Sequence, residues 1–173
     1  VEDTAFVVTF LQVDPLYTID LQDPLNPVVR GELKIPGFSN YLHPLSDGSL
    51  LGIGLDMDEN GWESYGVQIS RFDVSDLDNP QLADKVTLEN TGWSAAQSEH
   101  HAFNFYAPTA SLSVPVYSYD SGESELFVLR AGVGEDLSVL GSVGQSIIDD
   151  GSNDRYCTDF TRSVVIEGDA VRI

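Results

Sequence analysis

The chain repeats itself, and the repeat restricts the folds that it can adopt. The segment IDLQDPLNPVVRGEL, which begins at Ile19, aligns without a gap on FDVSDLDNPQLADKV, which begins at Phe72, at an offset of 53 residues. A weaker third copy, LRAGVGEDLSVLGSV, begins at Leu129 and lacks the Asn-Pro pair. Each copy predicts a strand, a turn and a returning strand, because Asn tolerates the left-handed region and Pro fixes its φ.

The segments between these copies are also typical of β-strands. Runs such as AFVVTF, LLGIG, VQISRFDV and ELFVLRA show a period of two, and clusters of Asp, Asn, Gly, Pro and Ser separate them. No convincing amphipathic helix of ten residues is present in the sequence. Two further strands lie between successive copies, so a repeat of roughly 50 residues holds four strands, which is typical of a β-propeller blade. The predicted fold is therefore all-β.

We predict a single all-β propeller domain over residues 1–173. The approximate blades are 5–35, 40–88 and 99–143, and 161–173 is expected to begin the next one. This amounts to about three four-stranded blades, fewer than the four to eight of a closed propeller. We therefore expect the chain to be part of a larger propeller. Its remaining blades, or self-association, are expected to cover the apolar faces and strand edges.

The net charge of the chain limits the classes of molecule that it can bind. It has 28 acidic and 8 basic residues, which gives a net charge of -20. Such a surface repels phosphate backbones and anionic lipids, so we expect no nucleic acid partner. No apolar run approaches the roughly 20 residues of a membrane helix, so we expect no membrane insertion. The acidic excess suits a salty or extracellular setting or cation binding, or it serves solubility alone.

Several motifs resemble those of a known family. They are DPLYTIDLQDPLNP, ELKIPGFSNYLHPL, FDVSDLDNP and HHAFNF. Together they resemble the secreted bacterial and archaeal β-propeller family that is distantly related to WD repeats, over most of residues 5–116. The resemblance implies a propeller fold and an extracellular, cell-surface or periplasmic protein. Because that family is largely uncharacterised, the resemblance transfers no catalytic residues.

The loop LDMDENGWES, over residues 55–64, is a candidate metal site. Acidic and amide side chains at alternate positions, followed by a glycine, are how a calcium loop begins. Val67 stands where an EF-hand needs a bidentate Glu, so an EF-hand is excluded. The alternative interpretation is a solvated connection between two strands. The candidate calcium ligands are Asp56, Asp58, Asn60 and Glu63.

Two histidines are candidates for lining a central channel. His43 precedes Asp73 by 30 residues, and His100 precedes Arg130 by 30, so we expect His43 and His100 at corresponding places in two blades. There they would bind a metal or an anion, or alternatively hydrogen-bond a neighbouring strand or blade. His100 and His101 are adjacent, and on a strand they would point to opposite faces and would not share a metal.

Three aromatic residues in or beside loops, Trp62, Tyr65 and Trp93, are candidates for a recognition surface. Exposed aromatic rings there would contact a peptide or a sugar. The alternative is that they fill gaps between blades.

Two functional hypotheses follow. The first is a non-catalytic, exported interaction or structural scaffold with a protein or carbohydrate partner, stabilised by calcium. The second is an enzyme, or a metal- or cofactor-binding propeller, with its site in the central channel. The sequence lacks the G-x-S-x-G motif of a nucleophile elbow, and nothing in it favours catalysis.

Overall fold

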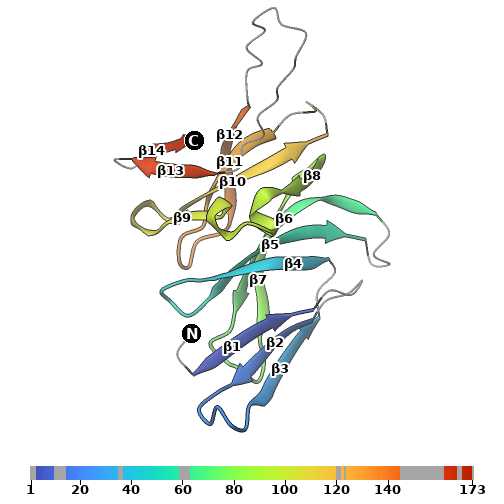
Figure 1. The fold of residues 1–173 in the computed structure, drawn as a ribbon, viewed down its shortest axis with the longest axis vertical. Helices are drawn as coiled ribbons and strands as arrows, with labels where there is room; N and C mark the ends of the chain where they lie inside the picture. The colour runs from blue at the N-terminus through green and yellow to red at the C-terminus, as the bar shows by residue number, and fades with distance from the viewer. Residues whose placement is uncertain are drawn as a thin grey trace, which may run out of the picture. The chain divides into compact units, whose positions relative to one another are not determined.

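The structure is a computed structural model, and the chain in it forms two compact units, Val1–Glu89 and Asn90–Ile173. Its regular elements are strands and three short 3₁₀ turns within the described residues (Figure 1). None of the helical turns described there is long or apolar enough to cross a membrane. The predicted all-β class is confirmed. The described residues are 3–9, 15–34, 37–58, 63–119, 122, 124–144, 162–166 and 169–172.

The first sheet of the unit Val1–Glu89 has three antiparallel strands in the order β1-β2-β3. On its central strand, Leu16 is buried. The outer strand β3 is mostly exposed, although Gly31 within it is buried. The three strands are β1 (Thr4–Val8), β2 (Pro15–Asp20) and β3 (Val28–Lys34).

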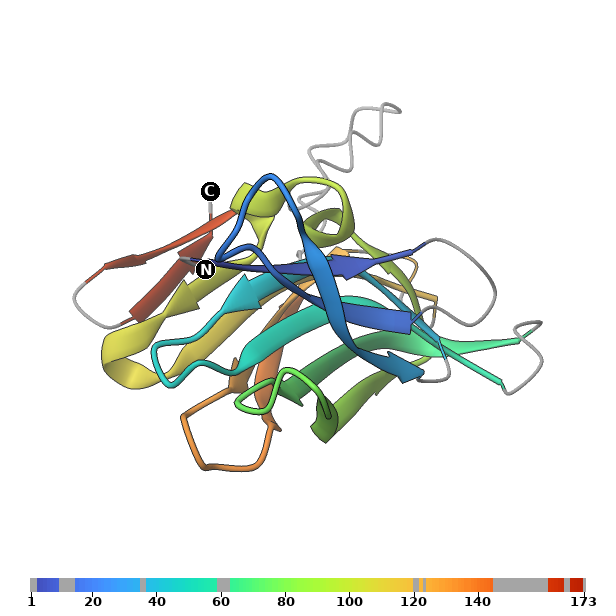
Figure 2. The same cartoon turned by 90° about the horizontal axis from the view of Figure 1, so that it is seen from below.

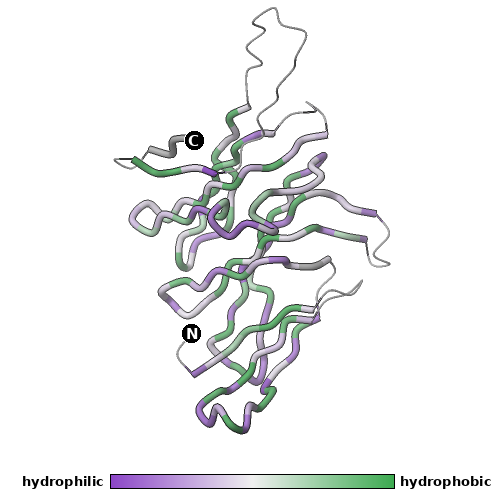
Figure 3. The backbone as a smooth tube through the Cα atoms, in the orientation of Figure 1, coloured by the Kyte–Doolittle hydropathy of each residue, from purple (hydrophilic) through white to green (hydrophobic). Residues whose placement is uncertain are grey.

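The second sheet of this unit has four antiparallel strands in the order β4-β5-β6-β7 (Figure 2). Its strands are β4 (Phe38–Pro44), β5 (Leu50–Met57), β6 (Ser64–Asp73) and β7 (Gln81–Glu89). The inner strand β6 is buried from Gly66 to Phe72, whereas the edge strand β7 alternates between exposed and less exposed residues. Hydrophobic and hydrophilic residues are interleaved along the strands accordingly (Figure 3).

The core of the first unit joins its two sheets. Leu16 of β2 packs in one cluster with Leu50 and Phe72 of the second sheet. Val74, in the turn after β6, completes the cluster. Gly52 makes room for this cluster, because a Cβ there would lie 2.9 Å from the ring of Phe72. Each blade-like sheet therefore covers an apolar face of the other, as stacked repeats require.

The two aligned copies of the repeat form the same turn. In the first, the carboxylate of Asp20 accepts a hydrogen bond from the Gln22 amide, and the Asn26 amide donates to the Asp23 carbonyl. In the second, the equivalent bonds run from Ser75 to the Asp73 carboxylate and from Asn79 to the Asp76 carbonyl. Asp side chains that accept from the backbone two residues on are a local device for starting a turn. The gapless alignment therefore reflects repeated turn geometry.

The second copy of this turn lies against the first sheet. The hydroxyl of Thr18 on β2 donates to the carbonyl of Leu77. Gly31 on β3 allows the close approach, because a Cβ there would overlap the Leu77 carbonyl and lie 2.7 Å from Cδ of Pro80.

The unit Asn90–Ile173 contains a sheet whose first strand is divided. β8 and β9 both pair with β10, at its opposite ends, and the order continues through β11 to β12. The sheet thus begins before residue 99, where the third blade is expected. A separate pair, β13 and β14, follows. The strands are β8 (Thr91–Ser94), β9 (Asn104–Tyr106), β10 (Ser111–Ser118), β11 (Ser124–Arg130), β12 (Ser138–Gly144), β13 (Ser163–Ile166) and β14 (Asp169–Arg172).

The weaker third copy of the repeat also forms two strands, β11 and β12, but it turns differently between them. The Glu135 amide donates to the Gly132 carbonyl at 3.3 Å, one residue earlier in the alignment than the corresponding bond of the other copies. Arg130, which replaces the turn-starting Asp, lies 3.7 Å from the Glu135 carboxylate. An ion pair thus stands where the first two copies use an Asp side chain.

Candidate functional site

The first carboxylate of the acidic segment 55–64, Asp56, lies near the end of β5 and already has partners. Asp56 is only 7% exposed. Its carboxylate accepts hydrogen bonds from Lys85 Nζ at 3.1 and 3.2 Å and from Thr87 Oγ1 at 2.6 Å, both on β7. These contacts satisfy a buried charge, which would otherwise be unfavourable. A metal at Asp56 would have to displace Lys85.

The base of this loop is closed by Asp58 and Glu63. The Asp58 amide donates to the Glu63 carbonyl at 2.9 Å, and the Glu63 amide donates to the Asp58 carboxylate at 3.1 Å. Asn60 and Trp62 lie outside the described residues. Within those described, Asp56, Asp58 and Glu63 do not form a group of converging ligand atoms. The calcium site stays a prediction.

His43 lies on β4, where its imidazole is half-buried. Its Nδ1 is 3.4 Å from the Tyr41 hydroxyl, and burial lowers the pKa of the ring below its usual value. In the register of the second sheet, His43 is opposite Leu51. His43 is thus part of a strand and is in hydrogen-bond reach of a side chain on that same strand.

His100 does not occupy the corresponding place in the third sheet, so that part of the prediction is wrong. It lies in the 3₁₀ turn η2 (His100–Ala102), and the register puts Asn104 of β9 where the second sheet has His43. The equal spacing of 30 residues misleads because the hairpin is shorter in the third sheet: Leu51 faces Arg71, whereas Ser113 faces Val128, which is fewer residues further on. Whether the two histidines line a channel stays a prediction.

The segment between β8 and β9 interrupts the first strand with two 3₁₀ turns, η1 (Ala95–Gln97) and η2. Ser94 begins η1 with a capping box: its hydroxyl accepts from the Ala96 amide, and the Gln97 side chain accepts from the Ser94 amide. The same hydroxyl donates to the Pro115 carbonyl at 2.6 Å. Ala96 and Ala102 are fully buried, so the segment is anchored at both turns.

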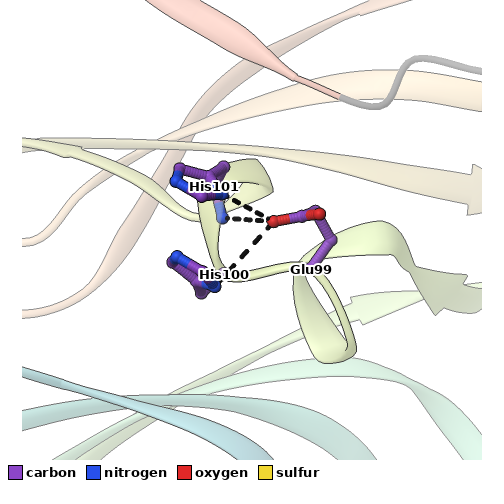
Figure 4. A group of neighbouring side chains, drawn as sticks. All are labelled: Glu99, His100 and His101. Atoms are coloured by element: carbon purple, nitrogen blue, oxygen red, sulfur yellow. Dashed lines mark hydrogen bonds and ion pairs between the residues drawn. The ribbon is translucent and has the colours of Figure 1, made fainter.

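This segment brings Glu99, His100 and His101 together (Figure 4). Glu99 Oε1 lies 2.8 Å from His101 Nδ1 and 3.8 Å from His100 Nδ1, and the two ring centroids are 3.9 Å apart. The expectation that adjacent histidines point to opposite faces is wrong here, because they lie on a 3₁₀ turn and not on a strand. Sequence reasoning therefore missed this cluster.

The Glu99 carboxylate is held from several sides. Its Oε1 also accepts from the His101 amide at 3.1 Å, and its Oε2 accepts from Arg162 Nη2 at 3.4 Å. The hydrogen bonds from the His101 side chain and backbone, with a smaller effect of Arg162, lower the pKa of the carboxyl below its usual value. Arg162 arrives there because Asn104 donates to the Ser163 carbonyl at 2.9 Å and so ties the start of β13 to β9.

The aromatic candidates are placed separately. Tyr65 is exposed on β6 of the first unit, and Trp93 on β8 of the second is 45% exposed. Tyr117 is opposite Trp93 in the register, and its ring meets that of Tyr119 edge to face, with centroids 5.9 Å apart. The signal that sequence reasoning missed was a pair of tyrosines two residues apart at the end of β10, Tyr117 within the strand and Tyr119 just after it.

A pocket of about 520 Å³ opens beside Trp93. Its volume lies within the range of about 300–1,000 Å³ that is usual for ligand pockets. Its lining residues include one with an indole ring and others with a hydroxyl, a carboxylate and a guanidinium. The lining residues are Trp93, Ala95, Ser98, Glu99 and Arg162.

A comparison with known protein families gives a match over nearly the whole chain. The model of the family described as "Beta propeller domain" matches residues 1–171. The chain belongs to this β-propeller family. The sheets of the structure are the antiparallel blades of that fold, as predicted.

Curated relatives of this β-propeller domain occur in archaea. An uncharacterised protein of Methanocaldococcus jannaschii is 44% identical over 117 residues, and the match covers 68% of this chain and 18% of the relative. An uncharacterised protein of Archaeoglobus fulgidus is 39% identical over 126 residues, with 69% and 19% covered. The chain thus spans less than a fifth of the length of these two relatives.

Because propellers host many unrelated functions, the site and not the fold must indicate what this propeller domain does. Around the segment between β8 and β9, an open surface presents the indole of Trp93, the carboxylate of Glu99, the guanidinium of Arg162 and the imidazoles of His100 and His101. Both histidine side chains are more than half exposed. Such an arrangement can stack on a ligand, donate and accept hydrogen bonds, and coordinate a cation.

Proposed function

We propose that this β-propeller domain is a non-catalytic interaction module of an exported protein, and that the pocket beside Trp93 binds a carbohydrate. The observation that carries the proposal is the combination of an aromatic wall with a carboxylate and a guanidinium in one pocket. A sugar ring has an apolar face that stacks on indole, and its hydroxyls both donate and accept hydrogen bonds. Glu99 accepts and Arg162 donates, so the pocket can satisfy both.

Binding fits this position better than catalysis does. Glu99 lies at an open surface, and hydrogen bonds from His101 hold the pKa of its carboxyl below its usual value, so the group favours the charged form that accepts hydrogen bonds. Groups that stabilise a transition state act most strongly where water is excluded. Ligand recognition needs no such enclosure, because aromatic contacts at a surface can carry much of a binding energy.

The proposed setting is extracellular. The net charge of -20 and the resemblance to secreted propellers support it. In this setting calcium is abundant, and we propose that the loop after β5 uses it to stabilise the second sheet, with Asp58 and Glu63 closing the loop base. The remaining blades are proposed to come from the rest of a longer protein or from a second copy, which would cover the exposed sheet faces.

The test follows the backbone-amide NMR signals of the isotope-labelled chain during titration with neutral oligosaccharides. The same titration is made with the Trp93→Ala variant. Saturable shifts at residues 93–99 are expected for the wild type. The variant should bind about thirtyfold more weakly, which corresponds to a loss of about 2 kcal/mol for an aromatic hot spot. Tyr65→Ala, which removes an exposed aromatic ring from the first unit, is the matched control and should leave binding unchanged.

Two outcomes would overturn the carbohydrate proposal. One is shifts that appear only with peptides and never with sugars. The other is sugar binding of equal affinity in the wild type and Trp93→Ala.

A further inference from the structure

Glu99, His100 and His101 present three potential ligand atoms to one point. One carboxylate oxygen of Glu99 and one ring nitrogen of each histidine all lie within 4.8 Å of one another. Zinc bonds to histidine nitrogen and carboxylate oxygen are about 2.0–2.2 Å long, so ligand atoms in a tetrahedral shell are about 3.4 Å apart. The measured separations from Glu99 Oε1 to the two Nδ1 atoms, 2.8 and 3.8 Å, bracket this value.

The cluster is held in place by its own backbone. Glu99 accepts the His101 amide at 3.1 Å, which ties the carboxylate to the turn that carries both rings. The Ala102 amide donates to the Glu99 carbonyl at 2.9 Å, and Ala102 is fully buried. Because the three ligands are consecutive in the chain, a single ordered turn positions all of them. Little conformational entropy is then lost when an ion binds.

The charges divide between the two oxygens of Glu99. Arg162 contacts Oε2 at 3.4 Å, whereas both histidines face Oε1. The guanidinium therefore holds the carboxylate through the oxygen that the histidines do not face. Partners outside the coordination shell orient metal ligands in this way. A ligating imidazole nitrogen must carry no proton, so an ion bound at Nδ1 of His101 would replace the contact that this atom now makes with Glu99 Oε1.

We propose that Glu99 Oε1 and the Nδ1 atoms of His100 and His101 bind a divalent transition-metal ion of the zinc type at the surface of the third blade. Two imidazoles and one carboxylate are ligands that suit zinc, copper and nickel. Calcium and magnesium prefer shells made of oxygen, so they would bind here weakly. Three protein ligands leave a position for water or for a ligand atom from the adjacent pocket. The inference does not depend on carbohydrate binding.

Histidine-ring NMR provides a direct test, because the chain contains only three histidines. Zinc is titrated into the chelator-treated chain in the presence of excess magnesium and calcium, which occupy oxygen-only sites. The ring signals of His100 and His101 should shift together and saturate at one ion per chain. The ring of His43, on β4 of the first unit, is the internal control and should not move.

Calorimetry of variants gives the affinity of each ligand. His100→Ala and His101→Ala should each weaken zinc binding by at least about tenfold, since even outer-shell substitutions have effects of that size. Glu99→Gln should do the same. Glu135→Gln is the matched control, because Glu135 is also an exposed carboxylate paired with an arginine. It should leave zinc affinity unchanged.

The titration of the histidine rings uses the wild-type chain, so it tests the proposal even if a variant fails to fold. Three results would overturn the proposal. They are ring signals that do not shift with zinc, an equal shift of the His43 ring, and wild-type affinity in the folded histidine variants.

Discussion

Arg30 and Asp78 form a two-pronged ion pair between the two sheets of the first unit. Nε and Nη2 of Arg30 each donate to one oxygen of Asp78 at 2.7 Å, and Nη1 donates to Asp20 at 3.2 Å. Arg30 lies on β3, and Asp78 lies in the turn between β6 and β7. The turn of one blade is therefore attached to the outer strand of the blade before it.

The first prediction concerns the geometry of this pair. Arg30→Lys should lower the melting temperature of the chain slightly, because lysine keeps the charge but cannot make two parallel hydrogen bonds to one carboxylate. Asp78→Asn should have an effect of the same sign. Thermal unfolding followed by circular dichroism measures both. The fall in melting temperature of the double variant should be smaller than the sum of the falls in the two single variants. A fall equal to that sum would show that the pair is not coupled.

The second prediction is a dependence of stability on pH. The hydrogen bonds from Arg30 lower the pKa of Asp78 in the folded chain below its usual value. A carboxyl with a lowered folded-state pKa contributes stability above its unfolded pKa of about 3.9, and this contribution is lost as the pH falls through the folded-state pKa. Urea unfolding between pH 6 and 3 should show stability falling. The fall should be shallower in Asp78→Asn, and an unchanged slope would contradict this account.

The third prediction concerns the close approach at Gly31. Gly31→Ala should reduce the free energy of unfolding by about 1–3 kcal/mol, which is typical of overpacking. The new Cβ would overlap the Leu77 carbonyl and crowd Pro80, and backbone cannot yield as a flexible side chain can. Chemical denaturation measures the change. Gly144→Ala is the control, because among the residues that the structure describes a Cβ there would meet only Cγ of Glu125, at 3.9 Å.

The fourth prediction separates the two roles of the acidic loop. Asp56→Ala should lower stability by about 1–3 kcal/mol even without calcium, because Lys85 and Thr87 lose a buried acceptor. Asp58→Asn should change stability less but should weaken calcium binding, which calorimetric titration into chelator-treated protein measures. Calcium binding that survives in Asp58→Asn and is lost in Asp56→Ala would show that the ion displaces Lys85.

The repeat and its turns could be read from the sequence because their chemistry is local. Asp20 and Asp73 each accept a hydrogen bond from the amide two residues further on, so the same short string forms the same turn wherever it occurs. The period of two and the spacing of these turns were then enough to predict an all-β chain of propeller blades. The matching family model confirms that prediction.

The arrangement of the site depended on contacts between distant residues. Asp56 looked like a loop ligand, but Lys85 of β7 lies beside it because the sheet pairs strands far apart in sequence. His100 was assigned to a strand, yet two 3₁₀ turns interrupt that strand and place both histidines against Glu99. Arg162, the residue before β13, reaches the same carboxylate. Local hydrogen bonding thus determined the repeated turns, whereas strand pairing over long sequence separations decided which side chains meet.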